Sequence, residues 1–204
     1  TLLILDRMLA PTARQMDAVA LQECSKSFLR QLSPLLNRRG YEVVPTLKPT
    51  GGKRHLDDGV VLYNTARLCL ESTVVMDQVF TGAGGEKPAR KKGKAMVVAT
   101  FAKTNNGLIC DDVQHLKIVA GKIPGAPRGP ALSEWAKFAV DVSSATEDKT
   151  VLFYVGDFNF LEEETKAALL AINPHHTLTW VEGVRYNTNI NPEGGYQKLG
   201  FGGG

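Results

Sequence analysis

The chain has 204 residues, of which 43% are hydrophobic, and its formal net charge is only +3. We expect residues 1–204 to form a single domain, because this length supports one sizeable core. The small charge argues against a protein that coats nucleic acid over its whole surface, so any polyanion site must be local. No apolar run approaches the roughly 20 residues that a membrane span requires, so we expect no membrane partner.

The three cysteines are odd in number and widely spaced, at Cys24, Cys69 and Cys110, and they form no Cys-x-x-Cys pair. This spacing is typical neither of a disulfide framework nor of a zinc site. We therefore expect an intracellular, reducing compartment, and the sequence does not distinguish cytoplasm, nucleus and organelle matrix.

The predicted elements begin with a short helix before Pro11, followed by a buried strand over residues 17–23. Apolar residues then recur at helical spacing over residues 25–39, and Gly40 stands where a helix C-cap is expected. The next segments are rich in strand-forming residues, and their predicted strands cover residues 41–44, 59–63 and 68–79.

Residues 81–94 contain no large apolar side chain, which predicts an exposed basic surface loop. Its cations could contact phosphate groups, whereas the alternative is a loop that only improves solubility. The candidate nucleic-acid-binding residues are Lys87, Arg90, Lys91, Lys92 and Lys94.

An Asn-Gly turn predicts a β-hairpin between residues 95–101 and 108–116, with His115 near the end of its second strand. A lone histidine at such a position is more often structural or solvent-facing than catalytic. A helix over residues 132–142 then leads to a buried strand over residues 151–155. This order predicts a mixed sheet with helices packed outside it.

The segment Gly-Asp-Phe-Asn ends the last of these strands and places Asp157 and Asn159 beside the sheet. In extended geometry both side chains leave the same side of the strand. A carboxylate beside a carboxamide suits a divalent cation and a phosphate oxygen, although an Asx turn is the alternative. Glu23 ends an earlier strand in the same way, and there the alternative is a side chain that simply reaches solvent.

Four short motifs occur in one order: Leu21-Gln22-Glu23, Asp58-Gly59-Val60-Val61-Leu62-Tyr63, His115-Leu116-Lys117 and Gly156-Asp157-Phe158-Asn159. Together they resemble the endonuclease/exonuclease/phosphatase family, and they are most similar to the branch that contains nocturnin and the deadenylases. The resemblance implies a four-layer α/β sandwich with mixed, largely antiparallel sheets and helices outside. It also implies hydrolysis of phosphoester bonds with Mg²⁺ or Mn²⁺, on RNA more readily than on DNA.

The resemblance assigns a role to each of four residues. Glu23 would be the metal ligand, and His115 would donate a hydrogen bond to the scissile phosphate. Asp157 would orient the attacking water, and Asn159 would contact the phosphate or the transition state. Such roles are physically reasonable, because magnesium prefers oxygen ligands and fixed donors stabilise charge that develops on the phosphate.

The chain also departs from the family pattern. No asparagine precedes Glu23 and no aspartate follows Asp157, so we expect the first strand and the last strands of the fold to be missing and the domain to be incomplete. One hypothesis is a metal-dependent phosphodiesterase or nuclease whose remaining residues lie outside these 204. The alternative is a catalytically degenerate binding or structural subunit of a ribonucleoprotein or protein assembly, with a protein partner covering the exposed sheet edges. In either case we expect the chain alone to be a poor hydrolase.

Overall fold

The computed structural model describes residues 2–11, 16–22, 24, 26–45, 59–76, 79, 96–104, 113–123, 128–176 and 179. Within these ranges the chain forms four α-helices and seven β-strands, and the strands make two sheets. The predicted mixed α/β architecture is therefore confirmed. Glu23 and the predicted basic loop over residues 81–94 lie outside the described residues.

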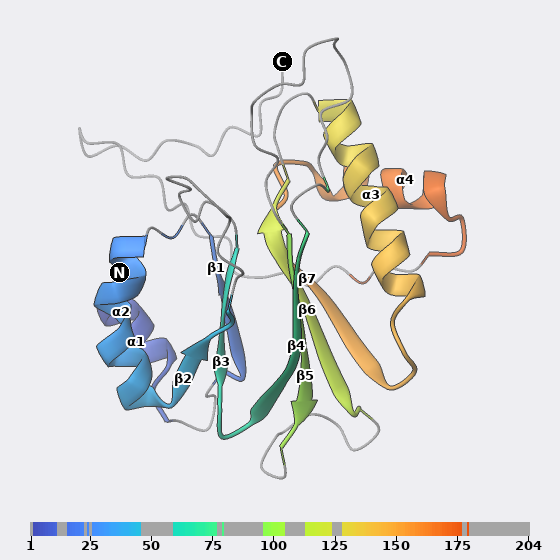
Figure 1. The fold of residues 1–204 in the computed structure, drawn as a ribbon. Helices are drawn as coiled ribbons and strands as arrows, with labels where there is room; N and C mark the ends of the chain where they lie inside the picture. The colour runs from blue at the N-terminus through green and yellow to red at the C-terminus, as the bar shows by residue number, and fades with distance from the viewer. Residues whose placement is uncertain are drawn as a thin grey trace, which may run out of the picture.

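The first sheet has the strand order β1-β3-β2, and both of its pairings are antiparallel. Its apolar outer face is covered by the amphipathic helices α1 and α2, which lie to one side of the molecule in Figure 1. The elements are α1 (Leu2–Met8), β1 (Ala18–Leu21), α2 (Lys26–Arg39), β2 (Tyr41–Val43) and β3 (Val60–Asn64).

Asp6 holds the two helices of this layer together at their exposed side. Its Oδ1 accepts a hydrogen bond of 2.9 Å from Arg39 Nε and one of 3.2 Å from Arg38. The hydrogen bond from Arg39 is the largest cause of the lowered pKa of the Asp6 carboxyl. These two hydrogen bonds therefore link α1 to the last turn of α2.

The second sheet has the strand order β4-β5-β6-β7, in which the first two pairings are antiparallel and β6·β7 is parallel. Two helices, α3 and α4, pack against its outer face (Figure 1). The predicted predominance of antiparallel pairing is confirmed for the described strands. The elements are β4 (Leu68–Met76), β5 (Met96–Lys103), β6 (His115–Lys122), α3 (Arg128–Ser144), β7 (Thr150–Asp157) and α4 (Glu162–Ile172).

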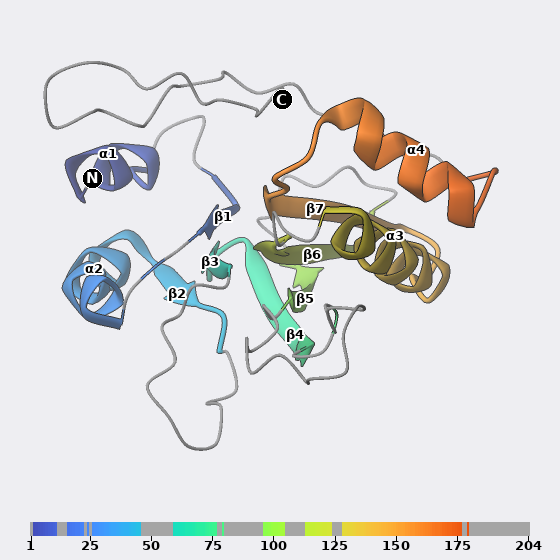
Figure 2. The same cartoon turned by 90° about the horizontal axis from the view of Figure 1, so that it is seen from above.

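The inner faces of the two sheets form a third apolar core. Figure 2 shows the two sheets lying side by side. Val61 and Tyr63 of β3 contribute to this core from one sheet, and Phe101 and Ile118 contribute from the other. The rings of Tyr63 and Phe101 lie 5.2 Å apart across the interface. Alternate residues of a strand face opposite sides. A residue at a strand end that is in phase with the residues of this core therefore projects between the sheets.

Two predicted element boundaries were wrong, and one helix was not predicted. The second hairpin strand was placed over residues 108–116, but β6 begins at His115 and continues to Lys122. The predicted turn between these strands lies outside the described residues. Helix α3 begins before residue 132, and α4 was missed. The strand extends further because residues 116–120 pair with β5 on one side and β7 on the other.

Among the described residues, no helix combines the length and apolar character needed to cross a lipid bilayer.

Candidate functional site

The parallel strands β6 and β7 bring two charged side chains together where both strands end. Lys122 lies opposite Asp157 in the register, and Lys122 Nζ is 2.8 Å from Asp157 Oδ2. Two residues earlier, Ala120 and Val155 pack in the core between the sheets. By strand alternation, Lys122 and Asp157 therefore project toward the same inter-sheet side. We call this end of β6 and β7 the carboxyl edge.

The first sheet meets the second at the same edge. A Cβ atom on Gly59, just before β3, would lie only 2.8 Å from the backbone nitrogen of Gly121 and 2.9 Å from the carbonyl carbon of Ala120. The two backbones therefore approach too closely for any side chain at Gly59. Because Leu21 pairs with Val60, the end of β1 and the following Gln22 also lie near this edge.

The end of β1 leads directly to Glu23, so the strand preceding the predicted metal ligand ends at the carboxyl edge. Glu23 itself is not among the described residues, and its role as a metal ligand stays a prediction. The same is true of the predicted nucleic-acid contacts of the basic loop, residues 81–94.

Asp157 and Asn159 lie at the end of β7, but Asn159 does not continue the extended geometry that we predicted. Asn159 has a φ of 54°, and its backbone N–H donates to Asp157 Oδ1 at 3.2 Å. Its side-chain Nδ2 donates to the carbonyl of Ile123 at 2.7 Å. The Asx-turn alternative is thus present, and the Asn159 carboxamide connects the end of β7 to the end of β6.

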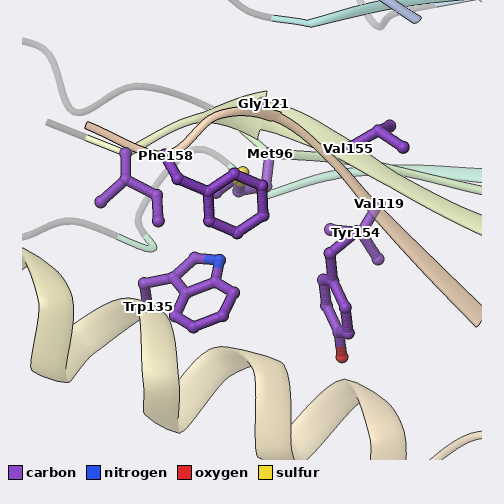
Figure 3. A pocket seen from close by; sticks show the side chains of 8 residues that line it. Met96, Val119, Gly121, Trp135, Tyr154, Val155 and Phe158 are labelled. Atoms are coloured by element: carbon purple, nitrogen blue, oxygen red, sulfur yellow. The ribbon is translucent and has the colours of Figure 1, made fainter. Parts of the chain in front are cut away.

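Phe158, between these two polar residues, anchors the turn in the core beneath α3. Its ring lies 5.3 Å from that of Trp135, and Trp135 also makes an edge-on contact of 6.0 Å with Tyr154 (Figure 3). The apolar cavity among these rings has a volume of only ≈ 10 Å³, about the minimum for one water molecule. It is therefore a packing gap that supports the site, too small for a substrate.

His115 does not join this site, so the expectation from the resemblance that it acts on the same phosphate as Asp157 was wrong. His115 is the first residue of β6 and pairs with Thr150 at the start of β7, whereas Asp157 is the last residue of β7. At ~3.3 Å per residue, the two ends of this pairing lie roughly 20 Å apart. A direct role for His115 at the phosphate is therefore incompatible with the parallel register.

A different partner engages His115 at the far end of the sheet. Its Nε2 lies 3.5 Å from Oε2 of Glu71, across the intervening strand β5. Glu71 lies in an irregularity of β4 where the register shifts between Leu70 and Ser72. Such a bulge redirects a side chain, and here it accompanies a contact between two strands that are not neighbours.

Sequence reasoning overlooked Lys122 and Gln22 as candidates at the carboxyl edge. Lys122 lies beyond residue 116, where the predicted hairpin strand ends, and the residues that follow it are rich in glycine and proline. A usable signal was the repeated pattern of an apolar run, a glycine and a charged residue, which ends β6 at Lys122 and β7 at Asp157. Opposite charges at equivalent positions of two parallel strands favour direct pairing.

The described residues do not fit a magnesium or manganese ion by themselves. Asp157 is the carboxylate at the carboxyl edge, and both of its oxygens already accept donors, from Lys122 and from the Asn159 backbone. A hard divalent cation requires several oxygen ligands, and the ammonium of Lys122 would oppose it electrostatically. No group of three or more His, Cys, Asp or Glu side chains suitable for a metal occurs within the described part of the chain.

Neither the protein-family models nor the curated proteins include a match to this chain. Solved structures do match. The D. rerio TDP2 structure with a single-stranded DNA product has a TM-score of 0.53 at 12% identity, covering 74% of this chain and 51% of TDP2. The structure of ANGEL2, a 2′,3′-cyclic phosphatase, in complex with adenosine-2′,3′-vanadate has a TM-score of 0.58 at 16% identity, covering 85% of this chain and 46% of ANGEL2.

The catalytic domain of human Nocturnin with a bound sulfate anion has a TM-score of 0.52 at 21% identity, covering 80% of this chain and 58% of that domain. These similarities show that the chain has the endonuclease/exonuclease/phosphatase fold, as the resemblance implied. Such identities do not resolve a branch of the fold. The chain spans about half the length of the TDP2 and ANGEL2 structures that it matches.

Proposed function

We propose that this chain is a phosphodiesterase-like domain whose carboxyl edge binds the phosphate groups of RNA, and that its described residues bind without hydrolysing. The observation that carries the proposal is the Lys122–Asp157 ion pair at the ends of two parallel strands. We also infer that the whole protein completes the four-layer sandwich implied by the family resemblance.

A lysine at this position can recognise phosphate without a metal. An ammonium group has three donors, so Lys122 can contact a phosphate oxygen while Asp157 limits its movement. Its side chain is 18% exposed and that of Asp157 is 40% exposed, so the pair lies at an accessible margin of the core. A ligand phosphate would compete with the Asp157 carboxylate for Lys122. Because that carboxylate is partly solvated, the change of partner costs little free energy.

The choice of RNA rests on the family resemblance, and the fold comparisons support phosphate chemistry in general. The TDP2 structure holds a DNA product, the ANGEL2 structure an adenosine vanadate and the Nocturnin structure a sulfate anion. The predicted basic loop over residues 81–94 would add contacts to neighbouring phosphates that do not depend on sequence.

The test is to replace Lys122 with methionine and measure the affinity for a short fluorescent RNA across a salt series. Losing one charge-assisted hydrogen bond should weaken binding about 10- to 100-fold. The slope of log affinity against log salt should decrease by about 0.7, the value for one phosphate on a single strand. DNA of the same sequence, measured in parallel, tests the preference for RNA.

Lys117→Met is the matched control because it removes the same charge from the same strand. Lys117 Nζ donates to Thr146 Oγ1 at 3.1 Å and lies away from the carboxyl edge. We expect this variant to bind RNA nearly as tightly as the wild-type chain. Equal losses in the two variants would show that only overall charge matters, and no binding by the wild-type chain would refute the proposed function.

A second candidate function is metal-dependent hydrolysis of RNA, with Glu23 holding Mg²⁺ or Mn²⁺. The observation that favours it is the position of the end of β1, which brings the segment leading to Glu23 to the carboxyl edge. It predicts that added Mg²⁺ tightens RNA binding in the wild-type chain and not in Glu23→Ala. An identical response of both proteins to Mg²⁺ would remove this candidate.

A further inference from the structure

Gln22 has an unusual carboxamide for a residue near a polar edge. Within the described part of the chain, neither its Nε2 nor its Oε1 has a hydrogen-bond partner, and both atoms are closed to solvent. Burying an unpaired amide is destabilising, and buried polar atoms in native proteins are nearly always paired. Such an unsatisfied group suggests a state of the protein in which the amide has a partner.

The position of Gln22 indicates which groups could supply that partner. Ala18 and Ala20 of β1 pack against the core between the sheets, whereas Val19 packs against the helices. Gln22 continues this alternation on the inter-sheet side, toward which Lys122 and Asp157 also project. Three polar side chains from two sheets thus share one side of one edge.

We propose that Gln22 is a ligand-positioning residue that exchanges hydrogen-bond partners with Lys122 when a phosphate group binds. This inference rests on the proposed phosphate-binding function. The phosphate draws the Lys122 ammonium toward itself, and Asp157 Oδ2 then loses its donor. The Nε2–H of Gln22 donates to that oxygen instead, so the carboxylate is not left unpaired beside an anion.

A carboxamide suits this exchange because it carries a donor and an acceptor but no charge. A second lysine would hold Asp157 permanently, and a carboxylate would repel both Asp157 and the phosphate. The unpaired amide of the free protein is then a local cost to folding that binding relieves. Polar groups that oppose stability in the free state are expected where a site serves function.

The experiment measures folding stability and RNA binding in Gln22→Met, which nearly preserves side-chain size but removes both polar atoms. We expect the midpoint of thermal unfolding to rise by about 2–4 °C, because the unpaired amide is gone. We expect RNA binding to weaken at least about tenfold, because Asp157 loses its replacement donor. If Gln22 had only a structural role, Gln22→Met would not raise the midpoint of thermal unfolding and at the same time weaken RNA binding.

Thr73→Val is the matched control, because Thr73 Oγ1 is another buried atom without a partner in the described chain. Thr73 lies on β4, two strands away from β6. We expect this variant to gain stability and to bind RNA as the wild-type chain does. The comparison separates the effect of removing a buried polar atom from the effect of removing it at the carboxyl edge.

A double-mutant cycle identifies the partner. If Gln22 acts through the Lys122–Asp157 pair, Gln22→Met should weaken binding far less in a Lys122→Met background than in the wild-type background. Unchanged RNA binding in Gln22→Met, or equal losses in both backgrounds, would overturn this inference while leaving the proposed function intact. No binding by the wild-type chain would overturn both.

Discussion

The Tyr154 hydroxyl connects the strand that carries Asp157 to the helix behind it. It donates to the carbonyl of Ala139 in α3 at 2.6 Å and lies 3.0 Å from Ser143 Oγ. Burial raises the pKa of Tyr154 to about 12, although the Ser143 hydrogen bond acts in the opposite direction. The hydroxyl therefore remains protonated in the folded protein at pH values where an unfolded tyrosine has begun to ionise.

The resulting pH dependence can be tested with Tyr154→Phe. The folded pKa lies above the ordinary value of 10, so the associated stability is complete below pH 10 and decreases as the pH rises toward 12. We expect the variant to lose about 1 kcal/mol of unfolding free energy at neutral pH and to show a shallower alkaline decline. Chemical denaturation between pH 7 and pH 11 measures the unfolding free energy and its alkaline decline. Ser143→Ala is the control, because it removes the hydroxyl beside Tyr154 but keeps the tyrosine that titrates. An unchanged alkaline slope in Tyr154→Phe would contradict the assignment.

Individual residues of the site could be predicted from the sequence only where the information is local. Asp157 was located correctly because a buried apolar run and a glycine precede it. His115 was misplaced because the pairing of Leu116 with Val151, 35 positions later, decides which end of the sheet it occupies, and no local pattern specifies this pairing. Lys122 was missed because the glycine- and proline-rich residues after it hide the end of β6, and because its significance depends on Asp157 in the neighbouring strand.

At the scale of elements, three glycines allow the strands of the carboxyl edge to approach one another closely. Gly121 lies opposite Gly156 in the register, and Gly59 approaches the same backbone from the other sheet. Gly121 and Gly156 each lie just before the charged residue that ends their strand, and Gly59 lies just before β3. The absence of side chains at these positions lets β3, β6 and β7 converge closely beneath Lys122 and Asp157.

Gly156→Ala is expected to disrupt this convergence. Gly156 has a φ of 151°, and an added Cβ would lie 1.8 Å from the carbonyl oxygen of Gly121. Because the obstructing atom is backbone, we expect the variant to lose about 3 kcal/mol of unfolding free energy or more.

Gly129→Ala is the matched control in the first turn of α3, where an added Cβ would meet no atom within 4 Å. It should be neutral or stabilising by up to about 1 kcal/mol, because alanine favours a helix. Urea denaturation compares the two variants. Similar stabilities for Gly156→Ala and the wild-type chain would show that the strands can separate without cost.

A helix could be predicted from the sequence when one of its faces is strongly apolar, and was missed when it is not. Helix α2 was found because Leu32, Leu35 and Leu36 are all buried along one face. Helix α4 was missed because only Thr165 and Leu169 are buried in it, which leaves little hydrophobic periodicity to detect. Its acidic first turn and the hydrogen bond from the Leu161 backbone to Glu164 were usable signals for a helix start.

At the scale of the whole molecule, the fold and the site support different conclusions. The arrangement of two sheets matches solved structures of the endonuclease/exonuclease/phosphatase fold over most of this chain, and the matched part is about half the length of the TDP2 and ANGEL2 structures. The order of four motifs was sufficient to predict the fold, although the motif at His115 begins β6 and does not end it. Catalytic ability depends on finer geometry, and here the candidate residues occupy two ends of one sheet.

We therefore predict that these 204 residues, supplied with Mg²⁺ or Mn²⁺, hydrolyse RNA with a turnover below about 0.01 s⁻¹, roughly a thousandth of a typical enzyme's rate. Asp157 has donors on both oxygens and is poorly suited to accept a proton from water, and His115 lies at the opposite end of the strands. Losing one positioned proton acceptor alone usually costs about 100- to 10,000-fold.

The measurement is a turnover assay on 3′-polyadenylated RNA and on RNA of mixed sequence, with binding measured on the same preparations. Two variants, Glu23→Ala and Asp157→Asn, distinguish intrinsic activity from a contaminating nuclease. Binding with negligible cleavage in all three proteins would agree with the prediction. Rapid metal-dependent cleavage that disappears in both variants would instead show that the Lys122–Asp157 pair opens readily and that Glu23 completes a hydrolytic site with Asp157, so that this edge is catalytic as well as phosphate-binding.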